Sequence, residues 1–265
     1  MTRRRLTEIW IYPVKSLGGI RMTSASVMEK GLTNDRRWML IDDRGKFMTQ
    51  RTTPPMALFK LKAQGDTFVV RHGADELILP RRGTLEGEQI TATIWDDEVQ
   101  VVEASPAHSA WFSKRLGIPC RLVEFPEQNP RLIDEQYRTG EEHVGLADGY
   151  PLLVIGQASL DDLNTRLDSP VPMNRFRPNL VFTGGAPYEE DTWKTFVVGK
   201  NKFKAVKTCA RCVLTTVNQD TAEKGREPLL TLSRYRKQGD RILFGMNVIP
   251  IDFNTINEGD EIDLF

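Results

Sequence analysis

The stretch TFVVGKNKFKAVKTCARCVLTTV, residues 195–217, is typical of β-structure and contains two of the three cysteines. Its first part is rich in β-branched and aromatic residues and predicts a pair of strands. The flanks of Cys209 and Cys212 are alternating and β-branched as well, which favours a strand rather than a helix around the two thiols. If this strand stays extended, residues three apart point to opposite faces, so one sulfur faces a pocket and the other packs. The alternative is a bulge that brings the two sulfurs together and allows a disulfide between them.

Short β-like runs broken by turn residues also dominate the first half of the chain. They are LTEIWIY, TFVVRH, ELILP, QITATIW and EVQVVE. The segment SPAHSAWFSKRLG predicts a helix there, with Ser105 as N-cap, Pro106 in the first turn and Gly117 as the stop. We expect Ala107, Trp111 and Leu116 to face the core.

The second half begins after a polar segment, Pro126–His143, that lacks clear periodicity. Beyond it, QASLDDLNTRL and LLTLSRYR predict helices, and the strand-like runs are PLLVI, NLVFTG, GMNVIPI and DEIDLF. The predicted fold class is therefore mainly β (α+β), with a β-barrel-rich domain over residues 1–125 and a second β-barrel domain with a few covering helices over residues 126–265.

Composition limits the classes of function. The 265 residues include 36 Lys plus Arg and 36 Asp plus Glu, so there is no global basic field for a nucleic-acid polymer or a membrane surface. No run approaches the ~20 apolar residues of a membrane span, and the N-terminal apolar stretch is too short for a secretory signal. Three cysteines are too few for a disulfide scaffold, which favours a reducing, cytoplasmic location.

The cysteines leave several kinds of site open. A structural zinc site or an iron–sulfur cluster needs about four ligands, and the other candidates, Cys120 and the three histidines, are scattered singly. A thioredoxin-like pair needs a helix N-terminus, which the flanks do not predict. A free cysteine is often a small core residue, but Lys207 and Arg211 near this pair favour a thiolate.

Cationic side chains occur at strand ends, where they are suited to an anion. YPVKS places Lys15 and Ser16 after a strand and before two glycines, and DRRW and NRFRPN place Arg36 and Arg177 at strand entrances. Arg forks bind phosphate and carboxylate through two parallel hydrogen bonds. Each residue alone is a weak signal, because a single cation near a strand end is most often solvated.

Taken in order, these motifs carry a resemblance to a known family. YPVKS, GL-x-x-DRRW-x-L, Met48-x-x-Arg51, D-x-x-PLLVI with ASLDDLN-x-RL, FRPN and C-x-RC-x-x-TTV are together similar to the mitochondrial amidoxime-reducing component and its bacterial relatives. These are MOSC proteins with an N-terminal β-barrel domain. The resemblance covers nearly the whole chain, from Ile9 to Leu264.

The resemblance implies a protein that binds the molybdenum cofactor (molybdopterin with Mo) between its halves. It assigns Cys212 to the metal and places Asp148 close to it, so these two are the candidate catalytic residues. The candidate cofactor-binding residues that it implies are Lys15, Ser16, Arg36, Arg51, Arg177, Asn179 and Arg211. A soft thiolate suits such a metal–sulfur centre, and the cations suit a phosphate.

The function that the resemblance implies is reduction of N-hydroxylated compounds: hydroxylamines, amidoximes or N-hydroxylated bases. Because the sequence has no G-x-G-x-x-G and only three cysteines, a separate flavin or iron–sulfur protein is expected to supply electrons. A cofactor carrier or storage protein, and a sulfur-transfer protein with a persulfide on Cys212, are the alternatives. The chain departs from the family's usual TTVDPDTG, reading TTVNQDTA over residues 215–222, which predicts a changed loop rather than a lost site.

Overall fold

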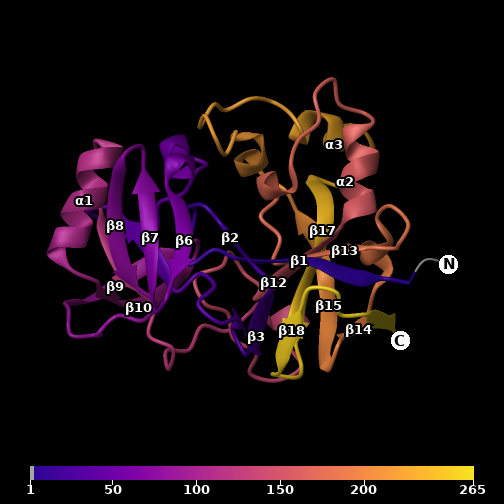
Figure 1. Ribbon diagram of the computed structural model, residues 1–265, viewed down its shortest axis with the longest axis horizontal. Helices are drawn as coiled ribbons and strands as arrows, with labels where there is room; N and C mark the ends of the chain where they lie inside the picture. The colour runs from indigo at the N-terminus through magenta and orange to yellow at the C-terminus, as the bar shows by residue number, and fades with distance from the viewer. Residues whose placement is uncertain (1–2) are drawn as a thin grey trace.

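The computed structural model describes residues 3–265, and over these residues it is built mainly from β-strands with three α-helices. The helices are α1 (Pro106–Leu116), α2 (Gln157–Asn164) and α3 (Leu229–Tyr235). The predicted mainly β fold class is confirmed. In Figure 1 the strands of the first half, in indigo to magenta, lie mostly on one side and those of the second half lie on the other.

The largest sheet contains nine strands in the order β19-β14-β15-β17-β12-β13-β1-β2, with β16 paired to β17. Most of its strands come from the second half, and the buried runs PLLVI and NLVFTG form its central strands β12 and β13. The strands are β1 (Arg5–Ile11), β2 (Ile20–Met22), β12 (Leu152–Gly156), β13 (Leu180–Thr183), β14 (Thr195–Val198), β15 (Asn201–Ala210), β16 (Lys237–Gln238), β17 (Arg241–Pro250) and β19 (Ile262–Leu264).

Strand β1 joins this sheet although it lies at the start of the chain. It pairs antiparallel with β13, with Ile9 opposite Leu180, and on its other side it pairs with β2. Figure 1 shows β1 on the side of the second half, next to β13 and near the N-terminus. The domain division at residues 125 and 126 stays a prediction, and this sheet contains strands from both sides of it.

Three smaller sheets complete the fold. One has the order β5-β11-β10-β9, another β6-β7-β8 and the third β18-β3-β4. Buried side chains from both halves, such as Phe59 and Phe203, belong to one hydrophobic core. The strands are β3 (Ser24–Met28), β4 (Gly31–Leu32), β5 (Trp38–Ile41), β6 (Lys60–Gln64), β7 (Thr67–His72), β8 (Asp75–Pro80), β9 (Gln89–Ile94), β10 (Asp97–Glu103), β11 (Arg121–Glu124) and β18 (Thr255–Asn257).

The predicted caps of α1 are confirmed. The Ser105 side chain accepts a hydrogen bond from the Ala107 backbone N–H, and Gly117 ends the helix in the left-handed conformation at φ 70°. The expected core face is only partly right. Trp111 and Leu116 pack against the core, but Ala107 is exposed, and Phe112 is the buried apolar residue of this helix.

Candidate functional site

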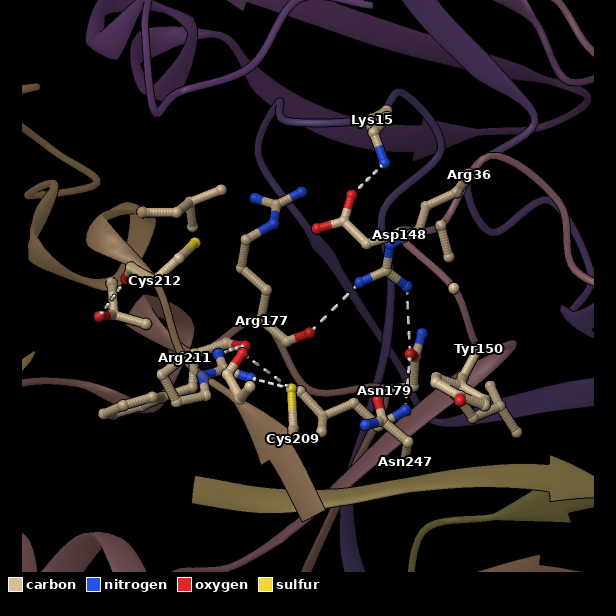
Figure 2. A pocket seen from close by; sticks show the side chains of 18 of the residues that line it. Lys15, Arg36, Asp148, Tyr150, Arg177, Asn179, Cys209, Arg211, Cys212 and Asn247 are labelled. Carbon is tan, nitrogen blue, oxygen red and sulfur yellow. Dashed lines mark hydrogen bonds and ion pairs between the residues drawn. The ribbon is translucent and has the colours of Figure 1, made fainter. Parts of the chain in front are cut away.

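One cavity is lined by all nine of the candidate site residues, which come from segments far apart in the sequence (Figure 2). They lie on the turn after β1, the segment before β5, the loop after β5, the loop before β12, the entrance to β13 and the end of β15. The nine are Lys15, Ser16, Arg36, Arg51, Asp148, Arg177, Asn179, Arg211 and Cys212. Cys209, Tyr150 and Asn247 line the same cavity.

The two cysteines do not lie on one continuous strand. The ladder between β15 and β17 is irregular between Thr208 and Ala210, and β15 ends at Ala210. Cys212 then adopts extended backbone as the N-cap of the short 3-10 helix η5 (Val213–Thr216). The irregular backbone brings both sulfurs to the same cavity, so the expectation that only one of them faces the pocket is wrong.

The surroundings of the two thiols differ. Cys212 is exposed. Cys209 is half-buried and packs against the hydrophobic cluster that contains Leu160 and Leu163 of α2. Arg211 lies between them: its Nη1 donates to Cys209 Sγ at 3.0 Å, and its Nη2 donates to the Phe176 carbonyl. All three cysteines are free. Cys212 is therefore the thiol that is open to a ligand, and Cys209 is held by a guanidinium.

A chain of charged groups leads from Lys15 to Cys212. Lys15 Nζ is buried and donates to the Leu146 carbonyl at 2.7 Å and to Asp148 Oδ1 at 2.5 Å. Arg51 Nη1 donates to Asp148 Oδ2 at 3.2 Å and lies 3.7 Å from Cys212 Sγ. Asp148 thus joins the two cations, and Arg51 brings their charge to the thiol.

These contacts shift the pKa values of the charged groups. Burial lowers the pKa of Lys15 to about 8, although Asp148 opposes that change. The cavity walls shield the half-exposed Asp148 carboxyl in part, which raises its pKa, but Lys15 and Arg51 outweigh this effect and hold that pKa well below its usual range. Burial opposes the charge of Arg51, yet Asp148 and Cys212 raise its pKa overall. At neutral pH the site therefore holds an ionised carboxylate between two cations.

Tyr12 is a buried residue that contacts two arginines of the cavity without lining the cavity itself. The guanidinium carbons of Arg36 and Arg177 are 4.7 Å and 4.2 Å from the centre of its ring, and its hydroxyl donates to the Pro178 carbonyl at 3.0 Å. Asn179, also buried, accepts from Arg36 Nη1 at 3.1 Å. Burial lowers the pKa of Arg177 to about 10, so this guanidinium is charged at neutral pH.

Three of the lining residues have left-handed backbone although none of them is glycine. The φ angles of Ser16, Arg36 and Arg177 are 65°, 51° and 56°. Such conformations cost roughly 1–3 kcal/mol each and persist where the surrounding structure enforces them, often at functional sites. Here they turn the chain at the three points where it passes the cavity.

The charge and hydrogen bonding of the lining predict an anionic ligand. The lining has five cationic side chains and a single carboxylate, although the whole chain has no net charge. Within residues 3–265, Arg51 Nη2, Arg177 Nη2 and Arg211 Nε are buried and have no hydrogen-bond partner. Buried donors are rarely left unpaired, so a ligand with several acceptor oxygens or nitrogens fits this cavity.

Sequence reasoning missed several residues that shape the site. Tyr12 stood inside the YPVKS motif, but a tyrosine at a strand end gives no sign that two arginines will stack on it. Tyr150 lines the cavity, and its buried hydroxyl has no partner in residues 3–265. Asn247 comes from β17, and its amide donates to the Lys207 carbonyl at 3.2 Å. A polar residue in a buried strand was the available signal for Asn247.

The described part of the chain has neither a metal-ligand cluster of its own nor a membrane-spanning helix. Over residues 3–265, no group of three or more His, Cys, Asp or Glu side chains is arranged to hold a metal ion. A metal at Cys212 would therefore need most of its ligands from a cofactor. No helix in the same residues is long and apolar enough to cross a membrane.

Comparison with known proteins places this architecture in a family. Residues 3–119 match the MOSC N-terminal beta barrel domain, and residues 141–263 match the MOSC domain. Human mitochondrial amidoxime-reducing component 1 is 33% identical, with 99% of this chain and 86% of that protein aligned. Bovine mitochondrial amidoxime reducing component 2 is 34% identical over 88% of this chain and 74% of its own.

Rice molybdenum cofactor sulfurase is 32% identical over 96% of this chain, which spans 33% of that longer protein. Among solved structures, the YuaD protein from Bacillus subtilis aligns over 99% of this chain and 97% of its own, at 9% identity and a TM-score of 0.43. The matches to the two MOSC models and to nearly full-length relatives establish that the chain belongs to the MOSC proteins with an N-terminal β-barrel domain, the family of the mitochondrial amidoxime-reducing components.

Proposed function

We propose that this protein binds the molybdenum cofactor in the cavity, with Cys212 as the protein's ligand to molybdenum. The observation that carries the proposal is an exposed thiol in a cavity lined by five cations, three of which have buried N–H groups without a partner. The residues proposed to hold the phosphate and pterin all line the cavity: they are Lys15, Ser16, Arg36 and Arg177. A thiolate is a ligand that a soft metal–sulfur centre accepts.

We infer that the loaded protein reduces N-hydroxylated compounds such as hydroxylamines, amidoximes and N-hydroxylated bases. For a hydroxylamine the balance is R–NHOH + 2 e⁻ + 2 H⁺ → R–NH₂ + H₂O. When bound, the cofactor supplies the two-electron chemistry. Asp148 is 54% exposed and held ionised by Lys15 and Arg51, so its carboxylate is suited to accept a hydrogen bond from the N-hydroxyl group and orient it.

Electrons are proposed to come from a separate flavin or iron–sulfur protein in the cytoplasm. The sequence has three cysteines and lacks the glycine-rich nucleotide fingerprint. Cys212 is exposed at the cavity, so a partner can approach the metal-binding wall. The same enzyme mixed with such a reductase and NADH should turn over, whereas NADH and the purified chain alone should not.

The test begins with protein purified from a host that makes the cofactor. Bound molybdenum and pterin are measured first, and reduction of benzamidoxime is then followed with an artificial electron donor. Cys212→Ser should lose molybdenum and activity, and Cys209→Ser, its matched control in the same cavity, should keep most of both. Equal losses in the two variants would instead indicate a dithiol mechanism, and loss in Cys209→Ser alone would reverse the assignment.

The same preparations separate the alternatives. A carrier or storage protein would hold molybdenum and pterin, would not reduce benzamidoxime, and would pass the cofactor to an apoenzyme. A sulfur-transfer protein would show sulfane sulfur on Cys212, measured by cold cyanolysis and mass spectrometry. Reductase activity that depends on bound molybdenum is the outcome we expect.

A further inference from the structure

Trp95 is an unusual residue at the turn between β9 and β10. Its side chain is large and apolar, yet the residue is 49% exposed. Its backbone is left-handed, with φ 56°, a conformation that a bulky residue rarely adopts. A glycine or asparagine would fit this turn more easily. The tryptophan side chain therefore has a use that compensates for a strained and exposed position.

The contacts of Trp95 show what that use is. The guanidinium carbon of Arg51 lies 4.4 Å from the centre of the indole ring. Phe47 packs against Trp95 with ring centres 5.3 Å apart, and Arg51 lies 5.7 Å from the Phe47 ring. Tryptophan is the best aromatic partner for a cation. Two aromatic rings from the first half of the chain thus support one arginine of the cavity.

The polar contacts of the Arg51 side chain in residues 3–265 are all made by one nitrogen. Its Nη1 lies 3.2 Å from Asp148 Oδ2 and 3.7 Å from Cys212 Sγ. Its Nη2 has no hydrogen-bond partner in residues 3–265. Both polar contacts are to groups at the open part of the cavity, since Asp148 and Cys212 are exposed. The flat face of the guanidinium is instead fixed by the indole ring.

We propose that Trp95, supported by Phe47, is a positioning residue that holds the Arg51 guanidinium against Cys212 and Asp148. Without the indole, Arg51 can swing into solvent, and the thiol and carboxylate lose their nearest shared cation. The positioning itself concerns the protein without cofactor, and its consequence for turnover rests on the proposed function. Trp95 is not among the residues that line the cavity, so it acts through Arg51.

The test uses the purified cofactor-free protein in a Cys209→Ser background, with labelling of Cys212 quantified by mass spectrometry. Two reagents are compared at one pH: the dianionic disulfide dithiobis(nitrobenzoate) and neutral iodoacetamide. Both react with the thiolate, so the ratio of their rates cancels the thiolate fraction and reports the local positive charge. Arg51→Leu shows the ratio of the disulfide rate to the iodoacetamide rate when that charge is absent. For a charge about 4 Å away, this ratio should be roughly three- to ten-fold lower than in the parent protein.

Trp95→Leu should lower the ratio nearly as far as Arg51→Leu, because leucine keeps apolar bulk but has no aromatic face. Trp95→Phe should restore most of it. The matched control is Trp111→Leu, which removes another arginine–tryptophan contact, Arg115 over Trp111 at 4.0 Å on α1, and should leave the ratio unchanged. Thermal unfolding of each variant checks that it is folded.

A Trp95→Leu protein with the parent ratio would overturn the proposal, as would a Trp95→Phe protein no better than Trp95→Leu. These outcomes do not depend on molybdenum, so they are distinct from failure of the proposed function. In loaded protein that reduces benzamidoxime, Trp95→Leu should lower kcat/KM about ten-fold and Trp95→Phe should recover it. Unchanged kinetics with a lowered ratio would overturn the role of Arg51 positioning in turnover.

Discussion

Gln50 and Gln219 exchange a reciprocal pair of side-chain hydrogen bonds, at 3.1 Å and 2.8 Å, across the two halves of the chain. Both are buried, and Gln50 also donates to the Ser16 carbonyl at 2.8 Å. The pair thus connects the Ser16 turn, the residue next to Arg51 and the loop that follows Cys212. Gln219 belongs to residues 215–222, where the resemblance predicts a changed loop, and this pair of hydrogen bonds ties that loop to the first half of the chain.

Loss of one member of this pair should destabilise the fold. Gln219→Ala leaves a buried amide of Gln50 without its partner, which should lower the free energy of unfolding by about 1–3 kcal/mol. Urea unfolding of Gln50→Ala, Gln219→Ala and the double variant gives a double-mutant cycle. The double variant should lose clearly less free energy of unfolding than the two single variants lose in sum. Strict additivity of these losses would show that the pair is not coupled.

Replacing Ala222 by glycine should stabilise the protein. Ala222 has φ 60°, in the left-handed region that favours glycine, and Asn218 Oδ1 closes that turn by accepting from the Asp220 N–H at 2.9 Å. Relief of left-handed strain exceeds the entropy cost of glycine, so Ala222→Gly should raise the free energy of unfolding by about 0.5–1 kcal/mol. Ala110→Gly in α1 is the control and should lower it by about 1 kcal/mol.

Arg177→Ala should remove cofactor without unfolding the protein. Its buried Nη2 is free for an acceptor, and a charge-assisted contact of about 1.5–3 kcal/mol corresponds to a roughly 10- to 150-fold weaker Kd. Pterin content after extensive dialysis is the measurement, with circular dichroism to confirm folding. The exposed Arg44→Ala serves as control and should keep its pterin. Full pterin content in Arg177→Ala would show that this arginine is structural only.

Cofactor retention should fall as the pH rises through about 8. Burial lowers the pKa of Lys15 to about 8, below its value in the unfolded chain, so its ammonium is fully present only below that pH. Between pH 8 and about 10.4 the unfolded chain binds more protons, so this group makes the fold itself more stable as pH rises. The titration of Lys15 therefore weakens anion binding at high pH without destabilising the fold.

Dialysis at pH 7 and pH 9, followed by pterin analysis, measures this effect. The Lys15→Met variant has no charge to lose at this position. It should retain less cofactor at pH 7 and show no step near pH 8. A step of the same size in the parent and in Lys15→Met would assign the titration to another group.

The sequence predicted the strands with clear alternation or apolar runs and the capped helix α1, because their signals are local: alternation, Ser105, Pro106 and Gly117. Short strands such as β2, β4 and β16 were missed, because two or three residues carry no periodicity. It also named nine residues that share one cavity, because the motif order carried information that single residues lack. The shared cavity of Cys209 and Cys212 could not be predicted, since it depends on a ladder irregularity before Ala210. Trp95 was missed because its partner, Arg51, is brought to it only by the tertiary structure.

The position of β1 in the large sheet has a consequence for how the protein is made. Thr7 on β1 donates to the Val181 carbonyl, and these residues are 174 positions apart in the chain. During synthesis, β1 leaves the ribosome long before its neighbour β13 exists. One edge of β1 can pair with β2, but the edge that faces β13 has no partner while the intervening strands form. Such non-local pairing slows folding and exposes the nascent chain to association with other chains. Chaperones that cover strand edges should therefore affect the yield of this protein more than its final stability.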